Sequence, residues 1–362
     1  MIITRTPFRV TLGGGGTDLP SYYETHGGFV FAMGIDTFMD IMVNPPTMDS
    51  KIRLHYSRSE TVDHVAELQH DLAREALRFH GIEEKIEVSS MADLPAGTGL
   101  GSSSAYLVGL LTALHQYRRW HVPLQSIAEE ACHIELDVLG KRIGKQDQYL
   151  AAFGGLCVLE IAPDGVVSVR TIELPSGAIH DFVANTHLYY TGTRRSAVEV
   201  LRDQDEAMRR PGAARNGEVE DSLHRIKDLG YRILAAVEEE DFDRWGVLLD
   251  EHWRQKRRMS DKISNGRIDE LYEEARRQFG VLGGKIIGAG GGGFLLLYCP
   301  RNHKRLEAFM ASQGMPRLHY TVEHEGSKVV ANLTSAPALR PQEPKRPEPT
   351  VRQRLTVPRS TA

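Results

Sequence analysis

The order of the predicted elements indicates an α+β protein with two domains. Residues 1–190 are mainly strand-like with interposed helices, whereas helical patterns surround a few strands from residue 197 onward. A chain of 362 residues is long enough for two domains with substantial cores. We therefore expect a first domain over residues 1–190 and a second over residues 191–336.

In the first half, alternating or β-branched segments predict strands, and apolar residues at helical spacing predict helices. The sequence at 163–165 is typical of a hairpin turn between the last two long strands. Strands are expected at residues 8–12, 28–43, 51–56, 85–88, 156–161, 166–174 and 188–190. One helix is expected to begin near residue 18, with Thr17 or Asp18 as its N-cap. Further helices are expected over residues 61–79, 105–115 and 124–139.

The second half predicts a small sheet flanked by helices, followed by a tail. Its helices are expected over residues 197–259, with a break near Pro211, and over residues 268–279 and 303–313. Its strands are expected at residues 285–287, 294–299, 318–322 and 329–333. Proline and charge dominate residues 337–362, which predicts a disordered tail.

The overall composition narrows the class of partner. The formal net charge of −4 does not favour nucleic acid or an anionic membrane as a partner. Three scattered cysteines show neither a disulfide framework nor a zinc pattern. We find no signal-peptide pattern, and no apolar run approaches the roughly 18 residues that cross a bilayer. These observations favour a cytoplasmic protein that acts on small molecules, and they leave homo-oligomer formation open.

The most informative segment is residues 94–105. Three glycines at alternate positions let the backbone turn tightly, and three consecutive serines follow at an expected helix start. Unpaired N–H groups and the positive end of the helix dipole attract phosphate there. The residues expected to hold phosphate are Pro95, Gly97, Thr98, Gly99, Leu100, Gly101, Ser102, Ser103 and Ser104.

Two further glycine-rich loops lie at residues 13–16 and 288–293. The second has G-x-G-x-x-G spacing, but a strand-like segment follows it where a dinucleotide-binding fold needs a helix. Residues 94–105 also lack the lysine of a Walker P-loop. Each loop alone would be explained by a tight turn. The three together favour nucleotide-dependent phosphoryl transfer.

These loops resemble the motifs of the GHMP kinase superfamily. Residues 7–18, 94–105 and 285–294 are similar to its first, second and third motifs. The resemblance implies a first domain like ribosomal protein S5 domain 2 and a ferredoxin-like second domain. It also implies ATP and Mg²⁺ as cofactors and a site in the cleft between the domains.

Within the superfamily, the chain is most similar to D-glycero-D-manno-heptose 7-phosphate kinases. This likeness is carried by residues 13–18, 146–149, 153–155, 253–256 and 263–265, although fucokinase-like sugar kinases are similar at the same places. Two departures concern substrate choice. Gly144 and Lys145 stand where these relatives carry a second glycine or another residue. The segment 190–197 is one residue shorter than in the same relatives.

The resemblance also implies roles for four polar residues. Ser103 and Glu135 match the Mg²⁺ ligands, Asp147 matches a general base for the sugar hydroxyl, and Arg9 matches the basic residue near the nucleophile. Each also has a plain structural explanation. The serine or the aspartate would cap a helix, and the glutamate or the arginine would face solvent.

Substrate contacts are expected from the first and third loops and from nearby basic residues. Glycines at positions 15 and 16 replace the side chains that galactokinases carry there, which leaves Asp18 to bind sugar hydroxyls. Guanidinium groups suit phosphate, which favours the two arginines at positions 194 and 195. The expected substrate-binding residues are Gly14, Gly15, Thr17, Asp18, Lys145, Gly192, Arg194, Arg195, Gly290 and Gly291.

The resulting hypothesis is an ATP- and Mg²⁺-dependent sugar kinase. Its expected reaction phosphorylates the anomeric hydroxyl of D-glycero-D-manno-heptose 7-phosphate to the 1,7-bisphosphate. One alternative is another sugar-1-kinase, acting on fucose or on unphosphorylated heptose. A second is a catalytically silent binding module on the same fold. The joint presence of Asp147, Ser103, Glu135 and Arg9 argues against a silent module, and the all-glycine first loop argues against a related decarboxylase.

Overall fold

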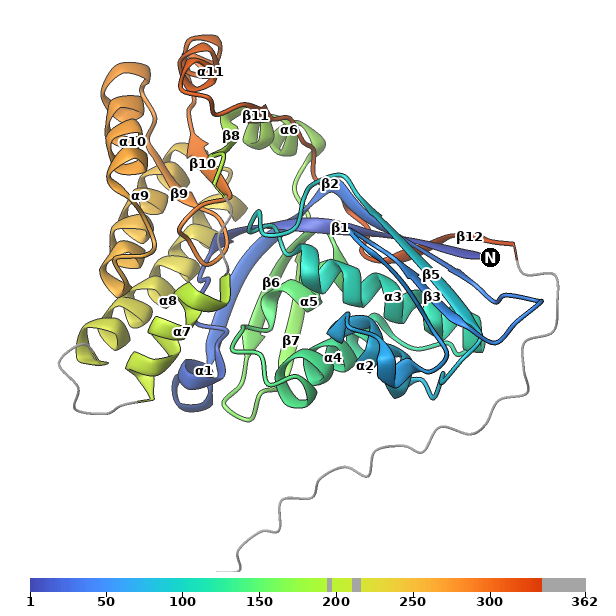
Figure 1. Cartoon of the computed structure of the whole chain (residues 1–362). Coiled ribbons are helices and arrows are strands. Elements are labelled where there is room, and N and C mark those ends of the chain that lie inside the picture. Colours follow the sequence, from blue (N-terminus) through green and yellow to red (C-terminus); the bar gives the residue numbers. More distant parts are fainter. Residues whose placement is uncertain (194–196, 210–215, 334–362) are drawn as a thin grey trace, which may run out of the picture.

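Two β-sheets organise the chain, and helices pack against both of them (Figure 1). The computed structural model describes residues 1–193, 197–209 and 216–333. The mixture of helices and sheets confirms the predicted α+β class. Among the residues that the structure describes, no helix combines the length and the apolar character needed to cross a membrane.

The larger sheet has eight strands. Their bounds are β1 Ile2–Gly13, β2 Gly28–Asn44, β3 Ile52–His55, β4 Ser59–Val62, β5 Ile86–Ala92, β6 Leu156–Ile161, β7 Val167–Ile172 and β12 Lys328–Asn332. The order is β12-β1-β2-β5-β3-β4, with β6 beside β2 and β7 beside β6. The long strand β2 pairs with β6 through its first residues and with β5 through its last, so it joins the two parts of this sheet.

Helices cover one face of the larger sheet (Figure 1). They are α2 Asp71–Phe79, α3 Ser102–Arg118, α4 Leu124–Cys132 and α5 Gln146–Phe153, with short turns η1 Val65–Glu67 and η2 His133–Val138. Two other helices of the first half, α1 Pro20–His26 and α6 Ser176–Asn185, lie next to elements of the second half and of the smaller sheet. α3 packs on β1 and β2 and is flanked by α2, α4 and α5. It is buried on every side from Ser104 to His115, as expected for the central helix of a layer.

The smaller sheet has four antiparallel strands in the order β11-β8-β10-β9. Its strands are β8 Thr186–Tyr190, β9 Gly283–Ile286, β10 Phe294–Tyr298 and β11 Arg317–Leu318. Its helices are α7 Ala197–Met208, α8 Asn216–Glu238, α9 Phe242–Met259, α10 Gly266–Phe279 and α11 His303–Ser312. α9 packs on β9, and α8 contacts α9 as well as β1 and β2, so α8 joins the two layers.

The predicted helix over residues 61–79 is wrong in its first part. Residues there form the end of β4 and the short turn η1, and regular helix begins only at Asp71. The Glu60 carboxylate accepts hydrogen bonds from the backbone N–H groups of Gln69 and His70, at 2.6 and 3.2 Å. His70 Nδ1 in turn caps α2 by accepting from the Ala73 N–H.

Two helix starts also differ from expectation. The residue before α1 is Leu19, which makes no side-chain cap, so neither Thr17 nor Asp18 caps this helix. Both side chains instead bond to other parts of the fold, as described below. α3 begins at Ser102, three residues earlier than expected, with Gly101 at its N-cap position.

Two strands do not follow the predicted division at residue 190. β8 precedes residue 191 but belongs to the smaller sheet, and β12 returns to pair with β1 in the larger sheet. The Ser327 hydroxyl lies 2.9 Å from both the Thr6 and the Thr112 hydroxyls, which ties the segment before β12 to the first layer. The division itself stays a prediction, and residues 337–362 lie outside the described part of the chain.

Candidate active site

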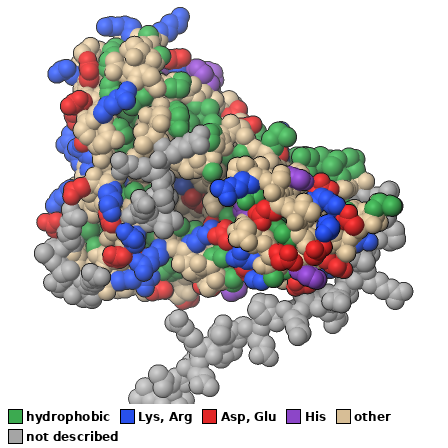
Figure 2. Space-filling view, viewed as in Figure 1, with side chains coloured by type: hydrophobic (Ala, Val, Ile, Leu, Met, Phe, Trp, Pro, Cys, Tyr) green, Lys and Arg blue, Asp and Glu red, His purple; other side chains and the backbone are tan. Residues whose placement is uncertain are grey.

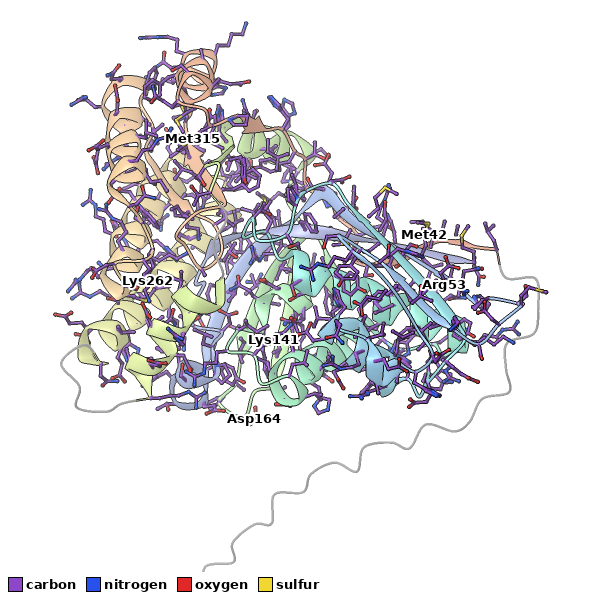
Figure 3. All side chains as sticks on the ribbon, in the orientation of Figure 1. Met42, Arg53, Lys141, Asp164, Lys262 and Met315 are labelled. Atoms are coloured by element: carbon purple, nitrogen blue, oxygen red, sulfur yellow. The ribbon has the colours of Figure 1, made fainter. Side chains whose placement is uncertain are left out.

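A cavity opens where the two layers meet, and residues from both halves line it. Charged side chains of both signs are scattered over this face of the molecule (Figure 2), and Lys141 lies near the middle of the molecule (Figure 3). Many residues singled out by the sequence analysis line this cavity. They are Arg9, Gly15, Asp18, Gly97, Gly99, Gly101, Ser102, Ser103, Ser104, Glu135 and Asp147.

The loop before α3 has the backbone that its glycines predict. Gly97, Gly99 and Gly101 have φ values of 81°, 80° and 82°, in the left-handed region that favours glycine. The N-cap Gly101 supplies no side-chain cap, and the first turn of α3 holds no acidic residue. The first N–H groups of α3 therefore have no capping side chain, which suits the binding of an anion such as phosphate.

The third glycine loop lies against the loop before α3, which we call the phosphate loop because its residues are expected to hold phosphate. A Cβ atom on Gly288 would lie only 2.7 Å from the carbonyl oxygen of Gly99. Side chains at this contact would push the two loops apart, and Gly288 itself lines the cavity. Pro95, Thr98 and Leu100 do not line the cavity, so their expected nucleotide contacts stay predictions.

Arg9 and Asp147 form an ion pair on the cavity wall. Arg9 Nε donates to Asp147 Oδ1 at 2.7 Å, and Arg9 Nη1 donates to the Gly99 carbonyl at 2.7 Å. Arg9 is buried on β1, whereas about a quarter of the Asp147 side chain is exposed in the first turn of α5. This arrangement holds a carboxylate next to the phosphate loop, where it can accept a proton from a bound hydroxyl.

Glu135 lies on the π-helical turn η2, which replaces the last part of the helix expected over 124–139. Its Oε2 accepts from Ser104 Oγ at 2.8 Å and Gln148 Nε2 at 2.6 Å, and burial raises the pKa of this carboxyl. Among the described residues, its Oε1 has only longer contacts, at 3.5 Å, to Ser103 Oγ and Lys141 Nζ. Ser103 and Glu135 thus offer oxygen donors of the kind that Mg²⁺ takes.

Asp18 is buried and heavily hydrogen-bonded. It accepts from the N–H groups of Gly16 and Gln146 and from the Gln146 side-chain amide, at 3.0–3.1 Å. Burial raises the pKa of this carboxyl, while the backbone donors oppose the rise. A Cβ atom on Gly144 would lie 1.8 Å from Asp18 Oδ2, so the glycine at 144 is required by this packing.

Several expected substrate contacts are not part of the cavity lining. Thr17 is fully buried, and its hydroxyl bonds to the carbonyls of Gly14 and Phe29 at 2.8 and 2.7 Å, so it has a structural role. Lys145 donates to the Gly165 carbonyl at 2.6 Å and lines a neighbouring cavity. Gly14, Gly192, Gly290 and Gly291 are absent from the lining, and Arg194 and Arg195 lie outside the described residues.

The structure also adds lining residues to which the sequence analysis assigned no role. They are Thr11, Lys141, Gln146, Gln204, Lys256 and Lys285. Thr11 Oγ1 donates to Gln146 Oε1 at 2.5 Å, and Gln204 Nε2 donates to the Gly16 carbonyl at 2.9 Å. Gln146, Lys256 and Lys285 fall within segments that carry the family resemblance. Their place within these segments was therefore the available signal.

Comparison with known proteins places this arrangement in a family. The models of the GHMP kinases N-terminal and C-terminal domains match residues 62–155 and 233–314. A mevalonate kinase from Methanothermobacter thermautotrophicus is 31% identical over 68% of this chain and 78% of its own length. The chain belongs to the GHMP kinase family. A D-glycero-α-D-manno-heptose 7-phosphate kinase from Campylobacter jejuni is 27% identical to this GHMP kinase over 86% of this chain and 94% of its own length.

Solved structures share the fold of this GHMP kinase. A D-glycero-D-manno-heptose 1-phosphate kinase from Bacteroides thetaiotaomicron superposes with a TM-score of 0.75 at 20% identity, covering 92% of this chain and all of its own. Lactococcus lactis galactokinase, solved with galactose, has a TM-score of 0.73 at 19% identity, covering 90% of this chain and 94% of its own. These likenesses confirm the two-domain α+β fold.

Family membership confirms the predicted class of enzyme. The protein is an ATP-dependent phosphotransferase whose acceptor is an alcohol group. Family membership therefore favours an active kinase over the alternative of a catalytically silent binding module. The individual roles of the cavity residues remain predictions. The distances given above state which atoms each role would involve.

Proposed function

We propose that this GHMP kinase is a sugar kinase that transfers the γ-phosphoryl group of ATP to the anomeric hydroxyl of D-glycero-D-manno-heptose 7-phosphate. The products are the 1,7-bisphosphate and ADP. The observation that carries the proposal is the Arg9–Asp147 pair, which lies directly beside the glycine loop at the start of α3. We expect this reaction in the cytoplasm, where ATP and sugar phosphates meet.

Asp147 is the proposed general base. Its carboxylate would accept the proton of the anomeric hydroxyl while the hydroxyl oxygen bonds to the γ-phosphorus and the bond to the β-phosphate oxygen breaks. Arg9 would hold Asp147 in place and place a positive charge near the transferred group. Because the transfer is direct, no phosphorylated enzyme forms.

The N–H groups at the start of α3 are proposed to bind the phosphates of ATP. Ser103 and Glu135 would hold Mg²⁺ together with the nucleotide phosphates, since Glu135 Oε1 has only long contacts to other polar atoms. The ion would neutralise negative charge on the phosphates.

Three observations support a sugar phosphate as acceptor. Asp18 and Gln146 form a polar group on the cavity wall, which suits sugar hydroxyls. Gly15 and Gly16 leave space beside this group. The Campylobacter jejuni relative, which is aligned over 94% of its length, carries the name of a heptose 7-phosphate kinase.

Mass spectrometry of the product tests the proposal. The protein is incubated with ATP, Mg²⁺ and, separately, heptose 7-phosphate, unphosphorylated heptose, fucose and galactose, while ADP release is followed. We expect a bisphosphate from heptose 7-phosphate and at least tenfold slower turnover of the others. Preferred turnover of fucose or unphosphorylated heptose would replace the proposed substrate by that sugar.

A further inference from the structure

Two lysines of the second half line the cavity although they are buried. Lys256 on α9 is 7% exposed and Lys285 on β9 is 2% exposed. Within the described ranges, no other lysine is buried to this extent. Because burial of an ammonium group is unfavourable unless the charge is compensated, the partners of these two lysines are informative.

Their hydrogen-bond partners are backbone carbonyls. Lys256 Nζ donates to the carbonyls of Ile286, at 3.2 Å, and Gly288, and Lys285 Nζ donates to the Leu12 carbonyl at 3.2 Å. Of the carboxylates that the structure describes, none forms an ion pair with either lysine within 4.0 Å. A carbonyl carries only a partial charge, so the two positive charges lack a full counter-ion.

The surroundings of Lys256 add positive rather than negative charge. Burial and then the charge of Arg9 on β1 lower the pKa of Lys256, and Asp18 is the carboxylate that raises it. Burial and the charges of Lys256 and Arg9 likewise lower the pKa of Lys285 on β9. His252, one turn earlier on α9, is buried with no partner for either ring nitrogen among the described residues. Burial and the two lysines lower the pKa of His252 well below its usual range, so it stays neutral.

The position of Lys256 indicates which ligand atoms it can reach. Its partner Gly288 packs against Gly99 of the phosphate loop, and Arg9 also bonds to the Gly99 carbonyl. The ammonium group therefore lies on the side of the cavity that faces the Arg9–Asp147 pair. Two of its three N–H groups are directed to carbonyls, which leaves one for a ligand.

We propose that Lys256 binds a phosphoryl oxyanion in this cavity, either the γ-phosphate of ATP or the phosphate of a phosphorylated sugar, with Lys285 as a second amine in the cavity lining. The inference rests on the proposed function, because that reaction brings both phosphates to the cavity. It goes beyond that function by naming an anion-binding residue from the second half of the chain, next to the contact between Gly288 and Gly99.

Proton uptake should accompany this binding. Burial, followed by the charge of Arg9, lowers the pKa of Lys256 to about 7, so much of it is neutral in the ligand-free protein above neutral pH. A phosphoryl oxyanion beside the amine favours its protonated form. The affinity for the phosphoryl group should therefore fall as pH rises above about 7 in the wild type, and the fall should be smaller when Lys256 is replaced.

Calorimetry with Lys256→Met tests the inference. Four probes are used with Mg²⁺: AMP-PNP, ADP, heptose 7-phosphate and heptose. Loss of a hydrogen bond to a charged group corresponds to about 10- to 100-fold in affinity. If the γ-phosphate is the ligand, the variant loses this factor for AMP-PNP but not for ADP. If the sugar phosphate is the ligand, it loses the factor for heptose 7-phosphate but not for heptose.

Controls keep the result interpretable. Lys304→Met, at an exposed position on α11, should bind every probe like the wild type. Circular dichroism verifies that Lys256→Met is folded, and Lys256→Gln, which keeps a donor for the carbonyls, replaces it otherwise. Repeating the titrations at pH 7, 8 and 9 tests whether Lys256 takes up a proton on binding. A purely structural role for the lysine would leave the pH dependence of the affinity unchanged in the variant.

The outcomes separate this inference from the proposed function. Unchanged affinities for all probes in a folded variant would overturn the inference. If the wild type does not bind heptose 7-phosphate, the proposed substrate fails, and the comparison of AMP-PNP with ADP then decides the role of Lys256. A loss shared equally by AMP-PNP and ADP would also contradict a contact to the γ-phosphate.

Discussion

The two walls of the cavity differ in how their charges are satisfied. On the first wall, which we define as Arg9, Asp18, Glu135 and Asp147, each charged group has hydrogen-bond partners within the protein. On the second wall, defined as Lys256 and Lys285, the lysines bond only to carbonyls of the described residues, and the neighbouring His252 on α9 has no partner among them.

This difference distinguishes charged groups that the protein already holds in position from charged groups that a bound anion would stabilise. A carboxylate that is already held in place requires no rearrangement when a substrate arrives, which favours catalysis. Buried ammonium groups without a counter-ion instead favour the arrival of an anion. We therefore expect substitutions on the first wall to change turnover, and substitutions on the second wall to change binding and its dependence on pH.

The largest effect is expected for Asp147→Asn on the first wall. An amide cannot accept the proton from the sugar hydroxyl, so kcat should fall by at least about 100-fold while ATP affinity changes little. Steady-state kinetics and nucleotide titration measure the two quantities. Asp228→Asn, at an exposed site on α8, is the matched control. Turnover at the wild-type rate would remove Asp147 from the mechanism.

A smaller effect is expected for Gly144→Ala, which tests the polar group around Asp18. The added Cβ would overlap Asp18 Oδ2 and displace this carboxylate from Gln146. The KM for the sugar should rise about tenfold, with a smaller change for ATP, as expected for a lost hydrogen bond to a charged group. Gly177→Ala, which meets no atom within 4 Å, is the control. An unchanged sugar KM would mean that Asp18 does not contact the substrate.

The two serines near Glu135 allow a finer comparison. Ser103→Ala should raise the KM for Mg·ATP several-fold, by up to about tenfold, and leave sugar binding nearly unchanged, since its hydroxyl is a proposed metal donor. Ser104→Ala should instead lower the free energy of unfolding by about 1–3 kcal/mol, because its buried hydroxyl bonds to Glu135. Kinetics and urea denaturation distinguish the two. Equal losses in both Michaelis constants for Ser103→Ala would count against the metal assignment.

The last prediction concerns the second wall and the dependence of stability on pH. The pKa of Lys256 falls from 10.5 to about 7 on folding, so the unfolded chain binds more protons between pH 7 and pH 10. The free energy of unfolding of the ligand-free protein should therefore rise with pH across this window. In Lys256→Met this contribution is absent, so the rise should be smaller. Urea denaturation at pH 7 and 9.5 measures it, and identical slopes in both proteins would contradict a buried titrating lysine.

Local patterns were sufficient to predict the loop and the helix start next to the first wall. The glycines and serines of residues 97–104 act through backbone conformation and a helix start, which neighbouring residues determine. The hairpin of β6 and β7 and the long strand β2 were likewise predictable from alternation and turn residues. The roles of Glu135 and Asp147 came from the family resemblance rather than from spacing.

The second wall depends on packing between segments far apart in the chain. Lys256 reaches the cavity because α9 packs on β9, and its partner Gly288 meets Gly99 from the first half. Neither contact leaves a periodic signal in the sequence. The same limit explains Thr17, whose neighbour Phe29 turns an expected substrate contact into a structural hydrogen bond, and strand β12, which pairs with β1 across the whole length of the chain.

A crystal structure with AMP-PNP, Mg²⁺ and heptose 7-phosphate tests most directly whether the two walls meet on one phosphoryl group. We predict that the triphosphate lies on residues 97–104, with the anomeric oxygen between Asp147 and the γ-phosphate and a phosphoryl oxygen on Lys256. A nucleotide bound away from residues 97–104, or an anomeric oxygen remote from Asp147, would contradict the proposed arrangement.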